Sequence, residues 1–255
     1  MTKSKTFTVA LIVVLILLAA SAWLMFGRTA AGMSYPDADK YTVGNTTVTR
    51  PVNNLYVDWT SGQVNIEYHD GTGVIVSETA NLDLSEDDKL RWWLDGDTLR
   101  IRFAKPGFRI SVNLDKHLTV SLPKGTVLKS ADIGTTSGDV FIPALAADDI
   151  RLGSTSGSIY PDLASVNKAE FGSTSGCFSG SVRAFRELKI HTTSGKVDVK
   201  LPTDPGFTCK VDSASGDLTT ALSLTKDGNR YTCGDGSARC SIDTTSGDIT
   251  LGSID

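Results

Sequence analysis

Seven serines, each preceded by a threonine or an alanine and followed directly by a glycine, are the first residues of this 255-residue chain that could carry chemistry. An exposed serine can act as a nucleophile when a base lies beside it. Seven copies of a catalytic serine would be redundant, however, whereas seven copies of a turn are expected in a repeated fold. We therefore predict that these pairs form turns with a structural role and that none of the serines is catalytic. The pairs are Ser61-Gly62, Ser137-Gly138, Ser156-Gly157, Ser175-Gly176, Ser194-Gly195, Ser215-Gly216 and Ser246-Gly247.

Three cysteines could form a disulfide. Cys209 and Cys240 each stand seven residues before the glycine of a Ser-Gly pair, so they share one inward-facing position of a repeat. If their repeats were neighbours in a stacked sheet, the two Cα atoms would lie ~4.8 Å apart, inside the ~4.4–6.8 Å range of disulfides. A bridge from Cys233 to Cys240 across a hairpin is the alternative, and buried free thiols are a third option. Cys177 has an outward position and no obvious partner.

The candidates for metal or acid–base chemistry are scattered. His69, His117 and His191 lack the spacing to cysteines or carboxylates that a zinc site needs, and we expect His191 to be a surface turn residue. Asp217 and Asp248 follow turn glycines and could hold a cation between neighbouring repeats. The nine-residue signature of calcium-binding β-rolls is absent, however. We predict no metal, no cofactor and no catalytic residues.

Aromatic residues suggest another kind of site. Trp59 and the pair Trp92-Trp93 could stack on sugar rings. In a strand, alternation would turn one of the two neighbouring tryptophans inward. Packing in the core, or capping the end of the fold, is therefore the role that we expect for them.

The Ser-Gly pairs recur at a nearly constant spacing, and this spacing indicates the fold. From Gly138 onward the successive gaps are 19, 19, 19, 21 and 31 residues, and the gap from Gly62 to Gly138 is 76, four times nineteen. Apolar residues recur seven and five residues before each glycine and two residues after it. Such alternation on both sides of a turn predicts short strands with one buried face.

One unit of this length cannot bury its own apolar face, but stacked units can, with each coil ~4.8 Å above the last. Nineteen residues are also too few for a strand–helix–strand crossover in every repeat. We therefore predict an all-β fold, a β-solenoid (β-helix-like) of ~19-residue coils. The Thr-Ser-Gly turns would stack along one edge as hydroxyl ladders, with glycine supplying a positive φ.

Two stretches interrupt the regular spacing. Between residues 67 and 118 the Ser-Gly turns are absent, and residues 90–103 predict two strands joined at Asp95-Gly96. The 31-residue gap before Gly247 holds extra residues that predict a hairpin around Asp227-Gly228.

The N-terminal segment predicts a membrane anchor. Residues 7–26 carry no charge and, as a helix of about 1.5 Å rise per residue, would span the ~30 Å core of a bilayer. Lys3 and Lys5 precede this stretch, which favours a cytoplasmic N-terminus. A signal peptide cleaved near Ala20-Ser21-Ala22 is the alternative. The predicted organisation is a cytoplasmic tip and transmembrane helix over 1–28, a spacer over 29–46 and an extracytoplasmic solenoid domain over 47–255.

The charge balance argues against nucleic acid as a partner. The formal net charge is −4, and Lys3, Lys5 and Arg28 all precede the solenoid, which leaves 22 basic against 29 acidic side chains in the remainder. A surface of that sign repels phosphate backbones, so we expect no nucleic-acid partner.

The residues also carry a family resemblance. The step Val120, Leu122, Pro123 and Gly125, together with the recurring turns and the closing TTSGDITLGSID, resembles the bacterial putative-adhesin family, domain of unknown function 4097, over roughly residues 50–255. The resemblance implies a β-solenoid in the cell envelope without enzymatic activity, and it carries over no catalytic or ligand residues. Some relatives, the LiaG-like proteins, are encoded with envelope-stress signalling systems in Gram-positive bacteria.

These features favour a non-enzymatic, single-pass cell-membrane protein with an extracellular scaffold for adhesion or for binding an envelope protein or a cell-wall polymer. The alternative is an accessory component of an envelope-stress signalling system that binds a neighbouring membrane protein. A carbohydrate-active β-helix enzyme would need clustered carboxylates along one groove. The acids that follow the turns alternate with Ser158, Cys177 and Lys196, which argues against such an enzyme.

Overall fold

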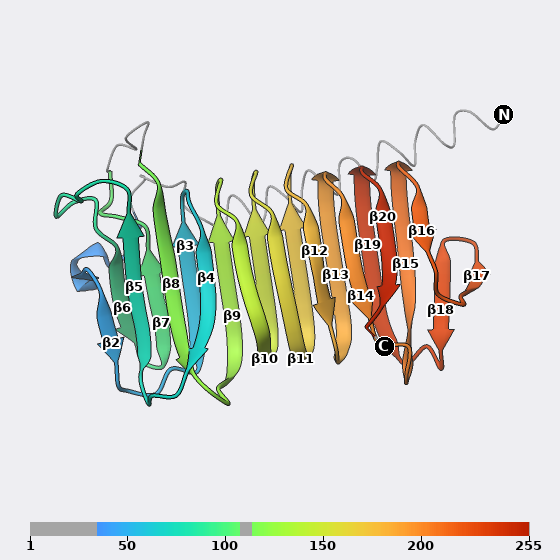
Figure 1. The fold of residues 1–255 in the computed structure, drawn as a ribbon, viewed down its shortest axis with the longest axis horizontal. Coiled ribbons are helices and arrows are strands. Elements are labelled where there is room, and N and C mark those ends of the chain that lie inside the picture. The colour runs from blue at the N-terminus through green and yellow to red at the C-terminus, as the bar shows by residue number, and fades with distance from the viewer. Residues whose placement is uncertain (1–34, 108–113, 255) are drawn as a thin grey trace.

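The computed structural model describes residues 35–107 and 114–254, which form twenty β-strands and one 3-10 helix, η1 (Ala38–Lys40). The strands wind into an elongated stack of coils (Figure 1). Each regular coil has a strand on one wall, a Ser-Gly turn, and a strand on a second wall, and the coils pair through parallel ladders. The predicted β-solenoid is therefore confirmed.

The wall that leads into the turns is called wall A. From the N-terminal end of the stack to the C-terminal end, its strands are β1 (Thr42–Val43), β6 (Arg91–Asp95), β7 (Thr98–Arg102), β3 (Asn54–Trp59), β9 (Val127–Thr135), the second parts of β10 (Val140–Ser154) and β11 (Ile159–Ser173), β13 (Phe185–Ser194), β19 (Ala238–Ser246), β15 (Gly206–Ser215), β18 (Arg230–Gly234) and β17 (Thr225–Asp227).

The wall that follows the turns is called wall B. In the same direction, its strands are β2 (Thr46–Val48), β5 (Val74–Ala80), β8 (Lys116–Pro123), β4 (Val64–His69), the first parts of β10 and β11, β12 (Phe178–Val182), β14 (Val197–Leu201), β20 (Ile249–Ser253) and β16 (Leu218–Thr220).

The order of the coils along the stack differs from their order in the chain. The coil that comes last in the chain, formed by β19 and β20, is inserted between the coils of β13 and β15. At the other end, β3 lies between β7 and β9, so the Gly62 turn lies directly beside the Gly138 turn. The 76-residue gap between those glycines therefore spans one step of the stack, and its match to four nineteens is a coincidence.

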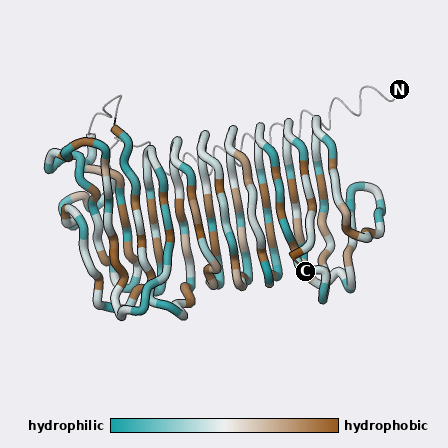
Figure 2. Tube along the Cα trace, in the orientation of Figure 1, coloured by the Kyte–Doolittle hydropathy of each residue, from teal (hydrophilic) through white to brown (hydrophobic). Residues whose placement is uncertain are grey.

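The repeated apolar positions form the core, as predicted, and Figure 2 shows hydrophobic residues recurring from coil to coil. All are buried except Val211 and Leu218, which belong to the last coil of the stack, where one side has no further regular coil. The buried members are Leu55, Val57, Val64, Ala131, Ile133, Val140, Ile150, Leu152, Ile159, Ala169, Phe171, Phe178, Leu188, Ile190, Val197, Cys209, Cys240, Ile242 and Ile249.

A buried ion pair closes the core at the N-terminal end. Trp59 is fully buried, meets the Phe103 ring edge-on at 4.8 Å, and donates from Nε1 to the Lys116 carbonyl at 3.1 Å. The Lys116 ammonium, also fully buried, lies 2.7 Å from the Glu78 carboxylate and bonds the carbonyls of Asp88 and Phe103. Of the two roles that we expected for Trp59, packing in the core is the one that the structure shows, because β3 lies between β7 and β9 and not at the end of the stack.

The irregular stretches contain the predicted hairpins. Strands β6 and β7 pair antiparallel around Gly96, and β17 pairs with β18 around Gly228. Both glycines have φ close to +60°, which suits tight two-residue turns. Part of the predicted spacer pairs with the solenoid, since β1 binds β6 and β2 binds β5.

Among residues 35–107 and 114–254, no helix is long and apolar enough to cross a membrane. The predicted transmembrane helix over residues 7–26 and the cytoplasmic tip lie outside the described residues.

Candidate functional site

The seven turns form one continuous ladder along the edge between the walls, in the order Gly62, Gly138, Gly157, Gly176, Gly195, Gly247, Gly216. Each glycine lies against the carbonyl of the glycine before it. A Cβ on Gly138 would lie 1.9 Å from the Gly62 carbonyl oxygen, and at the later steps the distances would be 1.9, 1.9, 2.4, 2.2 and 2.3 Å. No side chain larger than a hydrogen atom fits at these glycine positions, so the role of this edge is to let the coils stack closely.

The predicted reason for these glycines is only partly right. Gly62, Gly195, Gly216 and Gly247 have positive φ, but Gly138, Gly157 and Gly176 do not. Close backbone approach is the constraint that the turns share, because the coils are one strand spacing apart and the chain bends sharply at this edge.

The hydroxyls that hold the first regular turns lie three residues before the glycine, a position that sequence analysis missed. The N–H groups of Gly138, Gly157 and Gly176 donate to the hydroxyls of Thr135, Ser154 and Ser173 at 2.7–2.8 Å. The turns of Gly195 and Gly247 differ, because their N–H groups donate to the carbonyls of Ser246 and Ser215. The buried hydroxyls of Thr192 and Thr244 consequently have no hydrogen-bond partner.

The acids that follow the turns do not gather into a catalytic row. The carboxylates of Asp139 and Asp248 accept the N–H groups of Ser158 and Asp217, at 2.7 and 3.1 Å, and so tie neighbouring coils together. The coils of Ser158, Cys177 and Lys196 separate Asp139 from Asp248. Asp217 and Asp248 do lie in neighbouring coils, but the described part of the chain holds no group of three side chains able to bind a metal ion.

The cysteines lie as their spacing predicts, and all four have free thiols in this structure. Cys209 and Cys240 are register partners in the neighbouring parallel strands β15 and β19. Cys233, on β18, lies opposite Phe207 of β15. These three are buried, and Cys177 is exposed. The hydrogen bond with Cys209 and complete burial raise the pKa of the Cys240 thiol, which therefore stays protonated.

His191 lies within strand β13 rather than in a surface turn. It stands beside Gly172 on one side and Asp243 on the other, with Nδ1 3.2 Å from the Asp243 carboxylate. Burial alone would raise the pKa of the Asp243 carboxyl, but bonds from His191 and Ser241 outweigh burial and hold it below its usual value. This contact joins two neighbouring coils.

The tandem tryptophans point to opposite faces, as alternation predicts. Trp92 packs against the core. Trp93 lies outside, where Tyr41 meets it edge-on at 5.7 Å and the cations of Lys40 and Arg100 lie 4.8 and 5.9 Å from its ring centre. Neighbouring side chains of the same chain therefore occupy its surroundings, which disfavours Trp93 as a sugar platform.

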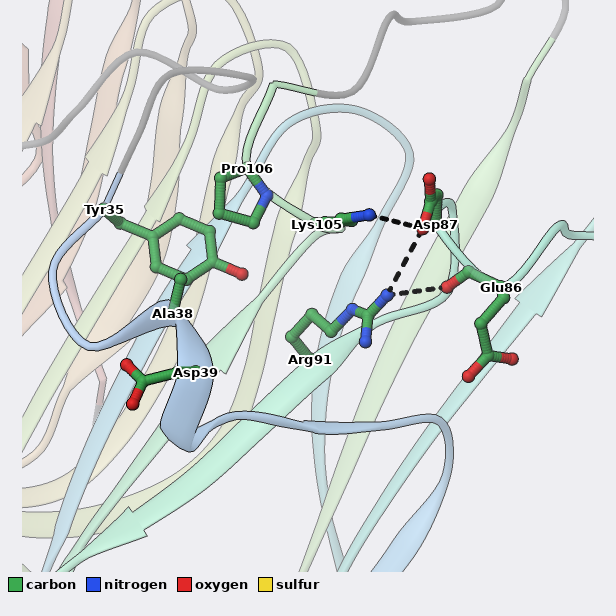
Figure 3. Close-up of a pocket in the computed structure, with 8 residues that line it drawn as sticks. All are labelled: Tyr35, Ala38, Asp39, Glu86, Asp87, Arg91, Lys105 and Pro106. Atoms are coloured by element: carbon green, nitrogen blue, oxygen red, sulfur yellow. Dashed lines mark hydrogen bonds and ion pairs between the residues drawn. The ribbon is translucent and has the colours of Figure 1, made fainter.

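A pocket of about 500 Å³ opens at the N-terminal end of the stack, beside η1 (Figure 3). Three of its charged side chains pair, since Lys105 and Arg91 lie 3.1 and 4.0 Å from Asp87. The Tyr35 hydroxyl donates to the Ala104 carbonyl, and burial raises the pKa of Tyr35 to about 12. That hydroxyl therefore remains neutral at physiological pH, which disfavours Tyr35 as a general base.

A partly exposed aromatic pair on wall B is a second feature that the sequence pattern did not reveal. Phe141 and Tyr160 occupy the third position after Gly138 and Gly157 and are register partners. Their rings stack with centres 4.8 Å apart and planes 9° apart, and Tyr160 is 37% exposed. Aligning the repeats would have shown two aromatic residues at one outward position. This pair is the strongest candidate contact surface on the regular coils.

The Toastrack DUF4097 family model matches residues 52–199 and 183–252. No curated protein matches the chain. A crystal structure of a candidate cell adhesion protein from Clostridium sporogenes is similar, with 15% identity over 84% of this chain and all of that one and a TM-score of 0.50, which shows a shared fold. A candidate adhesin from Bacteroides fragilis has 12% identity over 84% of this chain and 97% of its own, with a TM-score of 0.37. The family match covers most of the solenoid, and this chain belongs to the Toastrack DUF4097 family.

Proposed function

We propose that this protein is a non-enzymatic, membrane-anchored scaffold of the cell envelope that binds a wall polysaccharide through wall B. The observation that carries the proposal is the partly exposed stack of Phe141 and Tyr160. Support also comes from the structural relative described as a candidate cell adhesion protein, and the uncharged stretch over residues 7–26 supports an anchor.

The coil that follows Tyr160 places only a small side chain beside the aromatic pair. The register that pairs Ile159 with Phe178 and Asp162 with Ser181 places Ser179 beside Tyr160. Ser179 is small, so the outer face of the Tyr160 ring has room for a flat apolar partner. The C–H-rich face of a pyranose ring is such a partner, and aromatic rings supply large, rigid contact area for it.

Polar groups two residues further along wall B suit a sugar's hydroxyls. Asp162 accepts a hydrogen bond from the Ser181 hydroxyl at 2.6 Å and also bonds Arg183. These contacts hold the carboxylate in place beside the aromatic stack. An apolar platform next to a fixed polar group is the usual composition of a small-molecule binding surface.

The proposal can be tested with purified cell-wall sacculi in a sedimentation assay. The double variant Phe141→Ala/Tyr160→Ala should bind about tenfold more weakly, equivalent to about 1.4 kcal/mol. Leu82→Ala truncates another exposed apolar side chain, outside the Phe141–Tyr160 pair. It serves as the matched control and should bind as the wild type does. Equal binding by the double variant and the wild type would contradict the proposal.

The envelope location needs a separate test. Membrane fractionation of full-length protein with a C-terminal tag, followed by protease treatment of intact cells stripped of their wall, should place the tag in membranes and on the outside. Recovery of the tag only in the soluble fraction would contradict the anchor and favour cleavage near Ala20-Ser21-Ala22. A dominant crosslink to one membrane protein would instead favour the accessory role in envelope-stress signalling.

A further inference from the structure

A cationic pocket lies on the outer face of wall A near the C-terminal end of the stack. It encloses about 290 Å³ and is lined by Thr208, Lys210, Arg230, Gly236, Arg239 and Cys240. Its three cations come from three neighbouring strands, β15, β18 and β19. The chain as a whole carries a net charge of −4, so the positive charge of these three side chains is opposite in sign to the net charge of the chain.

The strand registers explain why the cations converge. Strand β15 pairs with β19 on one side and with β18 on the other. The register places Lys210 opposite Arg230 and places Arg239 opposite Thr208, and alternation directs these side chains to the same face. The insertion of β19 beside β15 is therefore what assembles the pocket.

Only one of the three cations of the pocket has an ion-pair partner among the described residues. Asp212 bonds Lys210. No carboxylate among the described residues lies within ion-pairing distance of Arg230 or Arg239. Glu187, the register partner of Arg239 on its other side, instead pairs with Lys189 at 2.8 Å. Two guanidinium groups thus remain available to an external anion.

We propose that this pocket binds the phosphate groups of a phosphodiester-containing envelope polymer. Guanidinium groups match the geometry of phosphate oxygens and bind them through paired hydrogen bonds. The Lys210 ammonium, already paired with Asp212, lines the same pocket. The pocket opens on an exterior sheet face, so an internal group of a long chain can reach it. This inference rests on the proposed envelope location and names a second class of wall ligand for the same scaffold.

The test titrates full-length protein in detergent with poly(glycerol phosphate), inorganic phosphate and polygalacturonate at low ionic strength, using calorimetry. Poly(glycerol phosphate) should bind the wild type, and Arg230→Gln/Arg239→Gln should weaken that binding at least tenfold. Lys200→Gln, which removes an exposed lysine from the other wall, should leave it unchanged. Circular dichroism and thermal unfolding of each variant would show that the fold is intact. Added salt should weaken binding because it screens exposed charges.

Four results would overturn the proposal. If the folded Arg230→Gln/Arg239→Gln variant binds the phosphate polymer as well as the wild type does, the two arginines are not the site. Equal binding of polygalacturonate would show a general polyanion surface rather than a phosphate site, and equal binding of inorganic phosphate per phosphate group would exclude the polymer as the specific ligand. Sacculus binding that depends on Phe141 and Tyr160 but not on the arginines would contradict this inference alone and leave the proposed function standing.

Discussion

Gly157 lies against the carbonyl oxygen of Gly138 so closely that a Cβ on Gly157 would be 1.9 Å from that oxygen. The same approach recurs at every step of the turn ladder. The most repeated residues of the sequence therefore serve the stacking of coils, and binding has to be carried by outward side chains that vary between coils.

Replacing Gly157 with alanine should destabilise the domain by on the order of 3 kcal/mol, because the new methyl group meets rigid backbone on a neighbouring coil. Gly252→Ala is the matched control, since a Cβ there would meet only ordinary contacts, the nearest at 3.4 Å. Urea unfolding followed by circular dichroism gives both values. Similar losses in the two variants would contradict the close-approach argument.

Two threonines at the same repeat position should respond oppositely to removal of the hydroxyl. Thr135→Val leaves the Gly138 N–H buried without its acceptor and should cost about 1–3 kcal/mol. Thr192→Val removes a buried hydroxyl that has no partner and should be neutral or stabilising. Chemical unfolding of the two isosteric variants measures the contrast. A loss at Thr192 as large as that at Thr135 would show that the two turns are built alike.

Acid should weaken the contact between the coils of His191 and Asp243. The pKa of Asp243 is lower in the folded protein than in the unfolded chain, so its contribution is present above about pH 4 and is lost as the pH falls further. Asp243→Asn should cost about 1–2 kcal/mol at pH 6 and progressively less below pH 4.

The measurement is thermal unfolding of wild type and variant between pH 3 and pH 7, with Asp83→Asn at an exposed position as the control. A difference between Asp243→Asn and wild type that stays constant across this range would contradict the assignment.

The thiols should differ in reactivity. In the native protein, iodoacetamide should modify Cys177 and spare the three buried cysteines, because burial excludes the reagent. In denaturant without reductant, all four should react. Mass spectrometry counts the adducts, and only two reactive thiols after unfolding would instead reveal a bridge within Cys209, Cys233 and Cys240.

Much of the architecture was predictable because each coil repeats the same buried positions. Ile190 and Cys240, for example, could be assigned to the interior from their distance to the next Ser-Gly pair. The insertion of β19 between β13 and β15 was not predictable. Every coil offers its neighbours the same apolar pattern and the same turn, so the pattern does not specify which coils are adjacent.

The binding features were harder to predict for a related reason. Phe141 and Tyr160 are outward residues, which the buried pattern does not constrain, and their contact depends on side-chain orientation. The cationic pocket arises only when Arg239 comes beside β15 through the inserted coil. Spacing in the chain gives no sign of that juxtaposition.

The most direct test of the central claim is photocrosslinking in living cells with a photoreactive amino acid at position 160 of the full-length protein. Polysaccharide binding through wall B should give a high-mass adduct that shifts to the size of the monomer when the wall is digested, and no such adduct when the probe stands at position 82. A discrete adduct with a single membrane protein, unaffected by wall digestion, would contradict it.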